Sequence, residues 1–324
     1  MNKKISIAVA VVVVVLVGII IIINNQKSSP LERKTVTIAS PRIISALLPV
    51  AVEKKFFDKY GIDVKLLPTQ TGDEAVKAVV GKSADIALVG TIPYSFLAID
   101  KPEMKIFVTI AEGRDMQMVS RKDRGISKPA DLKGKRVGYT KTSTSESGLE
   151  KFLEMNGLQK GDIQWINLKP LAMSTALLSG DIDAYFVWEP LVSTGVKTLG
   201  DKVIVFDTPD YSWLAGLVAN ETYITSNKDT LEKLVKALIE TDKFVSENKE
   251  EAIAITANFV NIPAETLNNI WPKFKFKVDL QNDLADILRV SLLWANDRRE
   301  FKSEKLPDPK NLIDNSIFEY AKNH

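Results

Sequence analysis

The chain has 324 residues, enough for two domains, and its apolar and charged fractions of 45% and 26% are those of an ordinary globular protein. A formal net charge of +2 gives no argument for nucleic acid or any other charged partner. The absence of cysteine excludes disulfides, thiolate metal sites and thiol catalysis. The only histidine is the last residue, His324, so we expect neither histidine catalysis nor a histidine metal site. We also expect no other metal site and no cofactor.

The first predicted element is a membrane helix. Lys3 and Lys4 precede an apolar run from Ile5 to Ile23, whose helical length is close to the ~30 Å thickness of the hydrocarbon layer. A cleaved signal peptide has a shorter apolar core and a small-x-small cleavage site, and this run ends in IIIIINNQKSSP without one. We favour an uncleaved signal-anchor and linker in residues 1–30, with a cleaved signal as the alternative. Either one predicts an extracytoplasmic protein, in the periplasm or at the cell surface.

Two later stretches follow one plan of β-α-β-α-β. The first runs from VTIAS to ALVGTIP and the second from RVGYT to AYFVWEP. Their first helices end at Gly61 and Gly157, where a left-handed cap is needed, and their second helices end at Gly81 and Gly180. The plan implies parallel strands joined by right-handed crossovers, in two lobes.

The aspartates Asp85 and Asp183 open the third strand of each stretch after a glycine turn. Such carboxylates usually accept hydrogen bonds from backbone N–H groups, so we interpret both as structural. We expect the first lobe at residues 31–114, the second at 115–219, and a return to the first lobe at 220–324. The lobes would hinge about crossings near Glu112 to Ser120 and near Ala219.

The remainder is predicted to be helical. The stretches KDTLEKLVKALIETDKFVSENKEEAIAITANF and DLADILRVSLLWANDRREF carry apolar residues at three- and four-residue spacing. These helices would pack on the first lobe.

Ligands of open α/β sheets lie outside the carboxyl ends of the strands. Four predicted loops meet this condition, two in each lobe: SPR (40–42), GTIP (90–93), TKTSTSE (140–146) and WEP (188–190). A small-molecule ligand is therefore expected in a cleft between the lobes.

Several motifs resemble the solute-binding proteins of the nitrate, sulfonate and taurine type, which serve ATP-driven (ABC) importers. They are VEKKFFDKYGIDVKL, SADIALVG, DLKGKRVGYTKTSTSE and ALLSGDIDAYFVWEP, and they occur in the order of that family. The resemblance implies a type II periplasmic-binding fold, α/β in class. It also implies an uptake function without catalysis, a small anion as ligand, and a membrane permease with its cytoplasmic ATPase as partners. We expect a monomer.

Two other functions remain open. Some relatives on this fold are enzymes that make a pyrimidine or process a menaquinone precursor, although the pyrimidine makers depend on histidine and cysteine, which this chain lacks in a usable place. The other alternative is a membrane-tethered ligand sensor, which would need to signal through another protein, because we identify no output domain after the lobes in these 324 residues.

The candidate ligand-binding residues lie in or near the predicted cleft loops. Ser143 and Glu146 have the spacing of a capping box, which accounts for both without a ligand, whereas capping does not require Thr144 or Ser145. A helix N-terminus also offers free N–H groups to a ligand. The full set is Arg42, Thr91, Ser143, Thr144, Ser145, Glu146, Trp188, Glu189, Tyr211 and Trp213.

Each of the remaining candidates has a plainer alternative. Arg42 is a cation that could pair with an anion, or an ordinary exposed arginine. Thr91 follows Gly90 at a strand end and would otherwise belong to a turn before Pro93. Trp188 is either a ligand platform or a core aromatic side chain, and Glu189 could bind an amine, a hydroxyl or a backbone amide.

Overall fold

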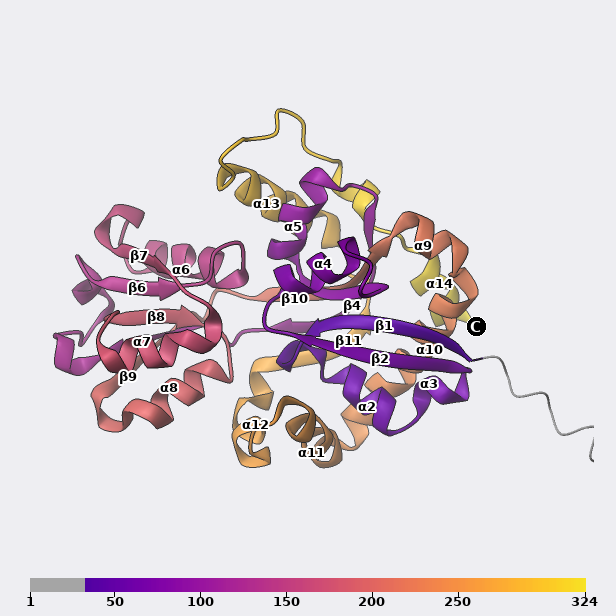
Figure 1. Ribbon diagram of the computed structural model, residues 1–324, viewed down its shortest axis with the longest axis horizontal. Helices are drawn as coiled ribbons and strands as arrows, with labels where there is room; N and C mark the ends of the chain where they lie inside the picture. Colours follow the sequence, from indigo (N-terminus) through magenta and orange to yellow (C-terminus); the bar gives the residue numbers. More distant parts are fainter. Residues whose placement is uncertain (1–32) are drawn as a thin grey trace, which may run out of the picture. The chain divides into compact units, whose positions relative to one another are not determined.

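The computed structural model describes residues 33–324, which fold around two β-sheets (Figure 1). The predicted membrane helix at Ile5 to Ile23 lies outside these residues. Within residues 33–324, no helix is both long enough and apolar enough to cross a bilayer.

The first sheet has the strand order β11-β4-β10-β3-β1-β2. Its strands are β1 (Lys34–Pro41), β2 (Ile62–Thr69), β3 (Ile86–Gly90), β4 (Met104–Gly113), β10 (Trp213–Asn220) and β11 (Phe274–Asp279). The helices of this lobe are α2 (Leu47–Glu53), α3 (Phe56–Lys59), α4 (Gly72–Val80), α5 (Thr91–Asp100), α9 (Glu221–Ser226), α10 (Lys228–Glu247), α11 (Lys249–Val260), α12 (Ala264–Ile270), α13 (Leu284–Asp297) and α14 (Ser316–Asn323).

The second sheet has the order β7-β6-β8-β5-β9, and three helices accompany it (Figure 1). Its strands are β5 (Gln117–Arg121), β6 (Arg136–Tyr139), β7 (Gln164–Asn167), β8 (Ala184–Val187) and β9 (Val203–Asp207). The helices are α6 (Thr144–Met155), α7 (Met173–Ser179) and α8 (Leu191–Leu199). We call this sheet with its helices the second lobe, and the first sheet with its helices the first lobe.

The predicted repeat is confirmed. The order β2-β1-β3 in the first sheet matches β7-β6-β8 in the second, and β1–β3, β6–β7 and β6–β8 all pair in parallel. Gly61 and Gly157 have φ of +71° and +67°, as a left-handed helix cap requires. Gly81 caps α4 with φ −78°, and the left-handed residue there is Lys82 instead.

The two aspartates play the same structural part in each lobe. Asp85 accepts the N–H of Thr37 at 2.7 Å and donates its own N–H to the carbonyl of Thr37. Asp183 makes the same pair of bonds with Arg136, whose side chain also binds its carboxylate at 2.8 Å. Each aspartate therefore joins the start of the third strand to the first strand, across more than forty residues of sequence.

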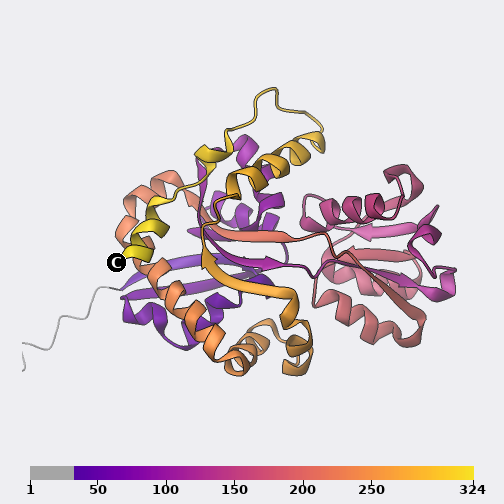
Figure 2. The ribbon, with the colours of Figure 1, turned by 180° about the vertical axis from the view of Figure 1, so that it is seen from behind.

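Two segments connect the lobes, between β4 and β5 and between β9 and β10 (Figure 2). The first connection, at 114–116, falls inside the predicted crossing. The second runs through 208–212, because β10 pairs with both β3 and β4. Residues 213–219 therefore belong to the first sheet, and the sequence-based limit near Ala219 was placed too late. The remaining domain limits stay predictions.

The helical prediction for the C-terminal part is confirmed, with one break. The stretch from Lys228 divides into α10 and α11 at Asn248, and the stretch from Asp283 forms α13. In contrast, GTIP is no loop: α5 begins at Thr91, and Pro93 lies in its first turn, where proline is tolerated.

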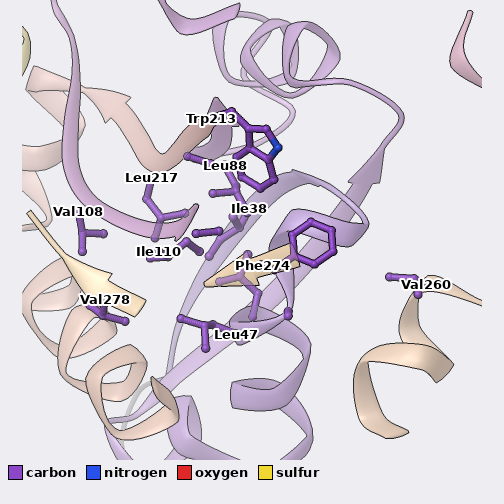
Figure 3. Packing of buried hydrophobic residues seen from close by; sticks show 14 of the residues in the cluster. Ile38, Leu47, Leu88, Val108, Ile110, Trp213, Leu217, Val260, Phe274 and Val278 are labelled. Atoms are coloured by element: carbon purple, nitrogen blue, oxygen red, sulfur yellow. The ribbon is translucent and has the colours of Figure 1, made fainter. Parts of the chain in front are cut away.

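The core of the first lobe lies between its sheet and helices (Figure 3). Ile38, Leu88 and Leu217 of the sheet are fully buried against neighbouring apolar side chains. At the edge nearest the second lobe, the indole of Trp213 lies over Gly113. A Cβ atom on Gly113 would come within 2.2 Å of the indole, so this contact requires glycine.

Gly113→Ala should therefore displace the Trp213 indole and lower the free energy of unfolding by several kcal/mol, as overpacking does. Chemical denaturation followed by tryptophan fluorescence measures both effects. The control is Gly161→Ala, where a Cβ atom would meet nothing within 4 Å. Equal stability of the two variants would contradict the tight packing described here.

Candidate functional site

A pocket lies between the lobes at the carboxyl ends of the parallel strands. It encloses about 490 Å³ of space, including open solvent at its mouth. Residues that follow β1, β2, β3, β6 and β8 all contribute, as expected for an open α/β sheet. Its lining residues are Pro41, Ile44, Gln70, Thr71, Gly72, Gly90, Pro93, Ser143, Thr144, Trp188 and Trp213.

The N-terminus of α4 forms one side of the pocket. The Thr71 hydroxyl accepts the N–H of Glu74 at 3.2 Å, and the Glu74 carboxylate accepts the N–H of Gln70 at 2.8 Å. Gly72, the first helical residue, packs so tightly against Val89 and Pro93 that a Cβ atom would lie 2.9 Å from each. This packing holds the starts of α4 and α5 next to each other.

The N-terminus of α5 follows directly from β3. No side chain caps this helix, and Pro93 removes one of its free N–H groups. A methyl group on Gly90 would meet Thr144 Cγ2 at 3.6 Å and the Leu214 carbonyl at 3.7 Å, which are ordinary contacts. Because φ of Gly90 is −72°, neither packing nor backbone conformation requires glycine here. The missing side chain leaves space in the pocket.

The N-terminus of α6 comes from the second lobe. The Ser143 hydroxyl accepts the N–H of Ser145 at 3.1 Å and donates to the carbonyl of Thr140 at 2.7 Å. The Glu146 carboxylate accepts the N–H of Thr142 at 2.7 Å, one residue before the position that a standard capping box uses. Thr142 has a left-handed backbone, φ +56°, which turns its N–H toward Glu146.

Two tryptophans form the apolar walls. Trp188 follows β8 in the second lobe, and Trp213 begins β10 in the first. Within the described residues the Trp188 indole N–H has no hydrogen-bond partner, whereas that of Trp213 donates to Asp115 at 2.6 Å.

Asp115 lies in the first connection between the lobes and is fully buried. Besides the Trp213 indole, its carboxylate accepts the N–H of Glu189 at 2.9 Å. It therefore joins both connections to the loop that carries Trp188. Burial raises the pKa of Asp115 to about 6, and the nearby Glu189 carboxylate adds to the rise, while the two hydrogen bonds oppose it.

A second buried carboxylate links the lobes close by. Glu189 accepts the N–H and the hydroxyl of Ser193 at 3.0 and 2.8 Å, at the start of α8. Its other oxygen binds Lys273 of the first lobe at 2.8 Å, and Lys273 also donates to Gln117 at 2.6 Å. Glu189 is thus fully paired within the protein.

The structure brings four of the ten predicted residues together in the pocket: Ser143, Thr144, Trp188 and Trp213. Whether they contact a ligand stays a prediction. The Thr144 hydroxyl forms no hydrogen bond within residues 33–324, so it is available to one.

The other six lie elsewhere. The guanidinium of Arg42 donates to the carbonyl of Phe259 at 3.1 Å, at the end of α11. Thr91 lines a separate hollow beside α13, and Tyr211 donates to or accepts from Ser147 at 2.6 Å.

Ser145, Glu146 and Glu189 face inward for a common reason: each satisfies buried backbone groups. Ser145 donates to the carbonyl of Phe186 at 2.6 Å and accepts the N–H of Thr140 at 3.2 Å. Burial raises the pKa of Glu146, and the hydrogen bond from Thr142 opposes the rise. None of these three side chains lines the pocket.

Sequence reasoning missed the loop after β2 and the residue Asp115. The loop could have been found, because Thr71-x-x-Glu74 before an apolar run is the same capping signal as Ser143-x-x-Glu146. Asp115 stands in a short connection without periodicity, and no sequence signal marks it.

The chemistry of the pocket suits binding. Three helix N-termini meet there, which favours an anionic group, and the tryptophans and prolines offer apolar surface. Among the residues that line it, none is acidic or basic, so the lining offers no general acid or base.

A family model described as NMT1/THI5 like matches residues 45–252, more than half of the chain. The chain belongs to the NMT1/THI5-like family. A taurine-binding periplasmic protein of Escherichia coli is 28% identical over 159 residues, 49% of each chain. A Bacillus subtilis relative, provisionally named as an aliphatic sulfonates-binding protein, is 23% identical over 307 residues, 92% of this chain and 91% of its own.

Solved structures show the same fold. The alkanesulfonate-binding protein SsuA from Xanthomonas axonopodis pv. citri, with MOPS bound, has a TM-score of 0.75 at 17% identity and covers 88% of this chain and 99% of its own. The desulfurization enzyme DszB has a TM-score of 0.70 at 16% identity, covering 90% and 99%. The two-lobed periplasmic-binding fold of the NMT1/THI5-like family thus occurs in binding proteins and in an enzyme.

The raised pKa of Asp115 predicts a pH-dependent stability. The folded protein binds this proton more tightly than the unfolded chain, so the contribution is present below about pH 4 and is lost as pH rises through about 6. The difference in unfolding free energy between wild type and Asp115→Asn should therefore fall between these pH values, by on the order of 2 kcal/mol.

Urea denaturation at several pH values measures this difference, and all other titrating groups cancel because both proteins contain them. Asparagine cannot accept both of the hydrogen bonds that Asp115 accepts, so a constant offset is also expected. A difference that stays flat with pH would show that Asp115 is ionised throughout this range in the folded protein.

Proposed function

We propose that the chain is an extracytoplasmic solute-binding protein that captures a small organic anion and delivers it to an ATP-driven importer. Its membership of the NMT1/THI5-like family supports the binding role, as do its taurine- and sulfonate-binding relatives. The observation that carries the proposal is the meeting of three helix N-termini and two tryptophans in one interlobe pocket.

The helix N-termini define the charge that the pocket prefers. Each contributes roughly half a positive charge, so α4, α5 and α6 together offer an anion about one and a half partial positive charges and no full one. Because no basic side chain lines the pocket, backbone N–H groups and the hydroxyls of Thr71 and Thr144 would supply the hydrogen bonds, since Ser143 already donates to the carbonyl of Thr140. A monoanion such as a sulfonate fits this set better than a multiply charged ion.

The apolar walls support a ligand that also has an apolar part. Ile44, Trp188 and Trp213 face the same space as the helix N-termini. A ligand with a hydrocarbon part would bury apolar surface here at about 25 cal/mol per Å². We therefore favour an organic sulfonate over an inorganic anion such as nitrate.

The same proposal includes the N-terminal anchor, which would tether the binding protein to the outer face of the cytoplasmic membrane, next to its permease. The apolar run from Ile5 to Ile23 and the missing cleavage site motivate it. Catalysis has no support from the pocket, whose described lining lacks acids and bases.

A thermal-shift panel on the full chain tests the ligand class. It should contain alkanesulfonates of increasing chain length, taurine, nitrate, matched carboxylates and neutral alcohols. A ligand at 100 times its dissociation constant should stabilise the fold by ~2.7 kcal/mol. We expect sulfonates to stabilise more than nitrate and the alcohols not at all. A response to none of the anions would overturn the proposal.

Gly90→Ala should weaken binding without harming the fold. The added methyl makes only ordinary contacts with the protein but occupies the space before the N-terminus of α5. We expect an unfolding free energy within about 0.5 kcal/mol of wild type and an affinity at least about tenfold lower for the best sulfonate, measured by calorimetry. Unchanged affinity would place the ligand away from α5.

Two glutamates provide a test of ligand charge with an internal control. Glu146 and Glu74 hold the same position in α6 and α4, but Glu146 is buried and Glu74 is exposed. Unit charges ~5 Å apart at an effective dielectric of about 20 interact by roughly 3 kcal/mol, and solvent reduces this. Glu146→Gln should therefore increase the affinity for an anionic ligand severalfold, while Glu74→Gln should change this affinity little.

Glutamine can still accept the backbone hydrogen bond at either position, so both variants keep the cap. Weaker binding by Glu146→Gln would indicate a positively charged group of the ligand near α6. An equal change in ligand affinity in both variants would show that the burial of Glu146 does not strengthen its effect on the ligand.

A further inference from the structure

A cluster of side chains joins α6 of the second lobe to α13 of the first, outside the pocket. The Glu150 carboxylate of α6 accepts from the Arg298 guanidinium, with one contact of 2.7 Å, and from the Trp294 indole N–H at 2.8 Å. Lys160 of the second lobe binds the same carboxylate at 2.8 Å. The three hydrogen bonds that Glu150 accepts from Arg298 and Trp294 all join the second lobe to the first.

The side chains of the cluster are mostly buried, and contacts with neighbouring residues hold them in place. The side chains of Glu150 and Arg298 are only 14% and 18% exposed, so solvent screens their bond less than a surface ion pair. Arg298 lies over the Trp294 ring at 5.3 Å and also binds Asp297, its neighbour in the chain. Trp294 in turn packs edge-on against Phe96 of α5 at 5.9 Å between centroids.

This position connects the cluster to the pocket. Glu150 lies seven residues after Ser143 in the same helix, which is about 10 Å along the axis. The N-terminus of α6 supplies Ser143 and Thr144 to the pocket, and Trp294 rests on α5, whose N-terminus lies opposite. A bond between Glu150 and α13 therefore fixes the separation of two helix N-termini that face the same pocket.

We propose that Glu150, Arg298 and Trp294 form a clasp that holds the two lobes closed and positions the N-terminus of α6 against that of α5. None of the three residues lines the pocket, so they act as positioning residues. Their effect on a ligand rests on the function proposed above, whereas the closure itself can be measured without any ligand.

Two matched variants, Glu150→Gln and Arg298→Gln, break the charged bond. The control pair is Arg299–Asp100, another two-contact arginine–carboxylate bond, at 2.9 and 2.7 Å. It lies next to Arg298 in sequence but joins the end of α13 to α5 within the first lobe. Arg299→Gln and Asp100→Asn should therefore disturb α13 to a similar extent without releasing the second lobe.

Because the chain has no cysteine, one pair of introduced cysteines can be labelled without background. Spin labels at the exposed positions Glu154 of α6 and Leu293 of α13 report the distance between the lobes in the full chain. We expect a narrow distance distribution in the parent protein. Glu150→Gln and Arg298→Gln should broaden it and lengthen its mean by several ångströms, while the two control variants leave it unchanged.

The double variant should match either single variant, because each one alone removes the bond. Thermal unfolding of each variant checks that the lobes remain folded. An unchanged distance in Glu150→Gln and Arg298→Gln would overturn the clasp, and so would equal changes in the control variants.

Once a sulfonate is found to bind, the clasp variants should release it faster, by roughly tenfold for the loss of a charged two-contact bond. The association rate should change less, because no pocket residue is altered. Longer distances in the variants without any detectable ligand would uphold the clasp and count against the proposed function. Unchanged distances with normal sulfonate binding would overturn the clasp and support the proposed function.

Discussion

The two lobes and the pocket depend on one buried carboxylate. Asp115 stands in the first connection, binds the Trp213 indole at the end of the second connection, and binds the backbone N–H of Glu189 beside Trp188. A single side chain thus fixes both tryptophan walls of the pocket relative to the connections. Burial away from water makes the ionised form of Asp115 unfavourable, and its pKa therefore rises to about 6. This unfavourable burial occurs where the two connections and the loop after β8 meet, and the hydrogen bonds of Asp115 hold them together.

Much of the fold could be predicted from the sequence because its signals are local. The glycines at 61 and 157 mark helix ends that need a left-handed residue, and the repeated order of turns marks two copies of one parallel motif. The antiparallel strands could not be placed in the same way. The sequence of β10, WLAGLVAN, has no polar side chain before Asn220, as expected for a strand in the middle of the first sheet. Such a run does not reveal which sheet it joins, and the second connection was therefore placed about seven residues too late.

The site was less predictable than the fold. Capping signals located the N-terminus of α6, but they could not show which hydroxyls would face the pocket. Ser143 and Thr144 line it, whereas Ser145, one residue further, faces β8 and binds the carbonyl of Phe186. The sequence predicts Glu189 as a ligand-binding residue next to Trp188, but its carboxylate is already bound to Ser193 and Lys273. Adjacent residues in a helix or turn point in different directions, and only their tertiary partners decide which one is free.

The pairing of the connections has a mechanical consequence. In the first sheet β4 and β10 are hydrogen-bonded up to Gly113 and Trp213, and in the second sheet β5 and β9 are bonded from Gln117 and Asp207 onward. The link is therefore a two-stranded ribbon interrupted by only a few residues. A ribbon of this kind resists shear within its plane more than it resists bending across that plane. The ribbon therefore favours bending as the relative motion of the lobes, and such bending would change the width of the pocket between them.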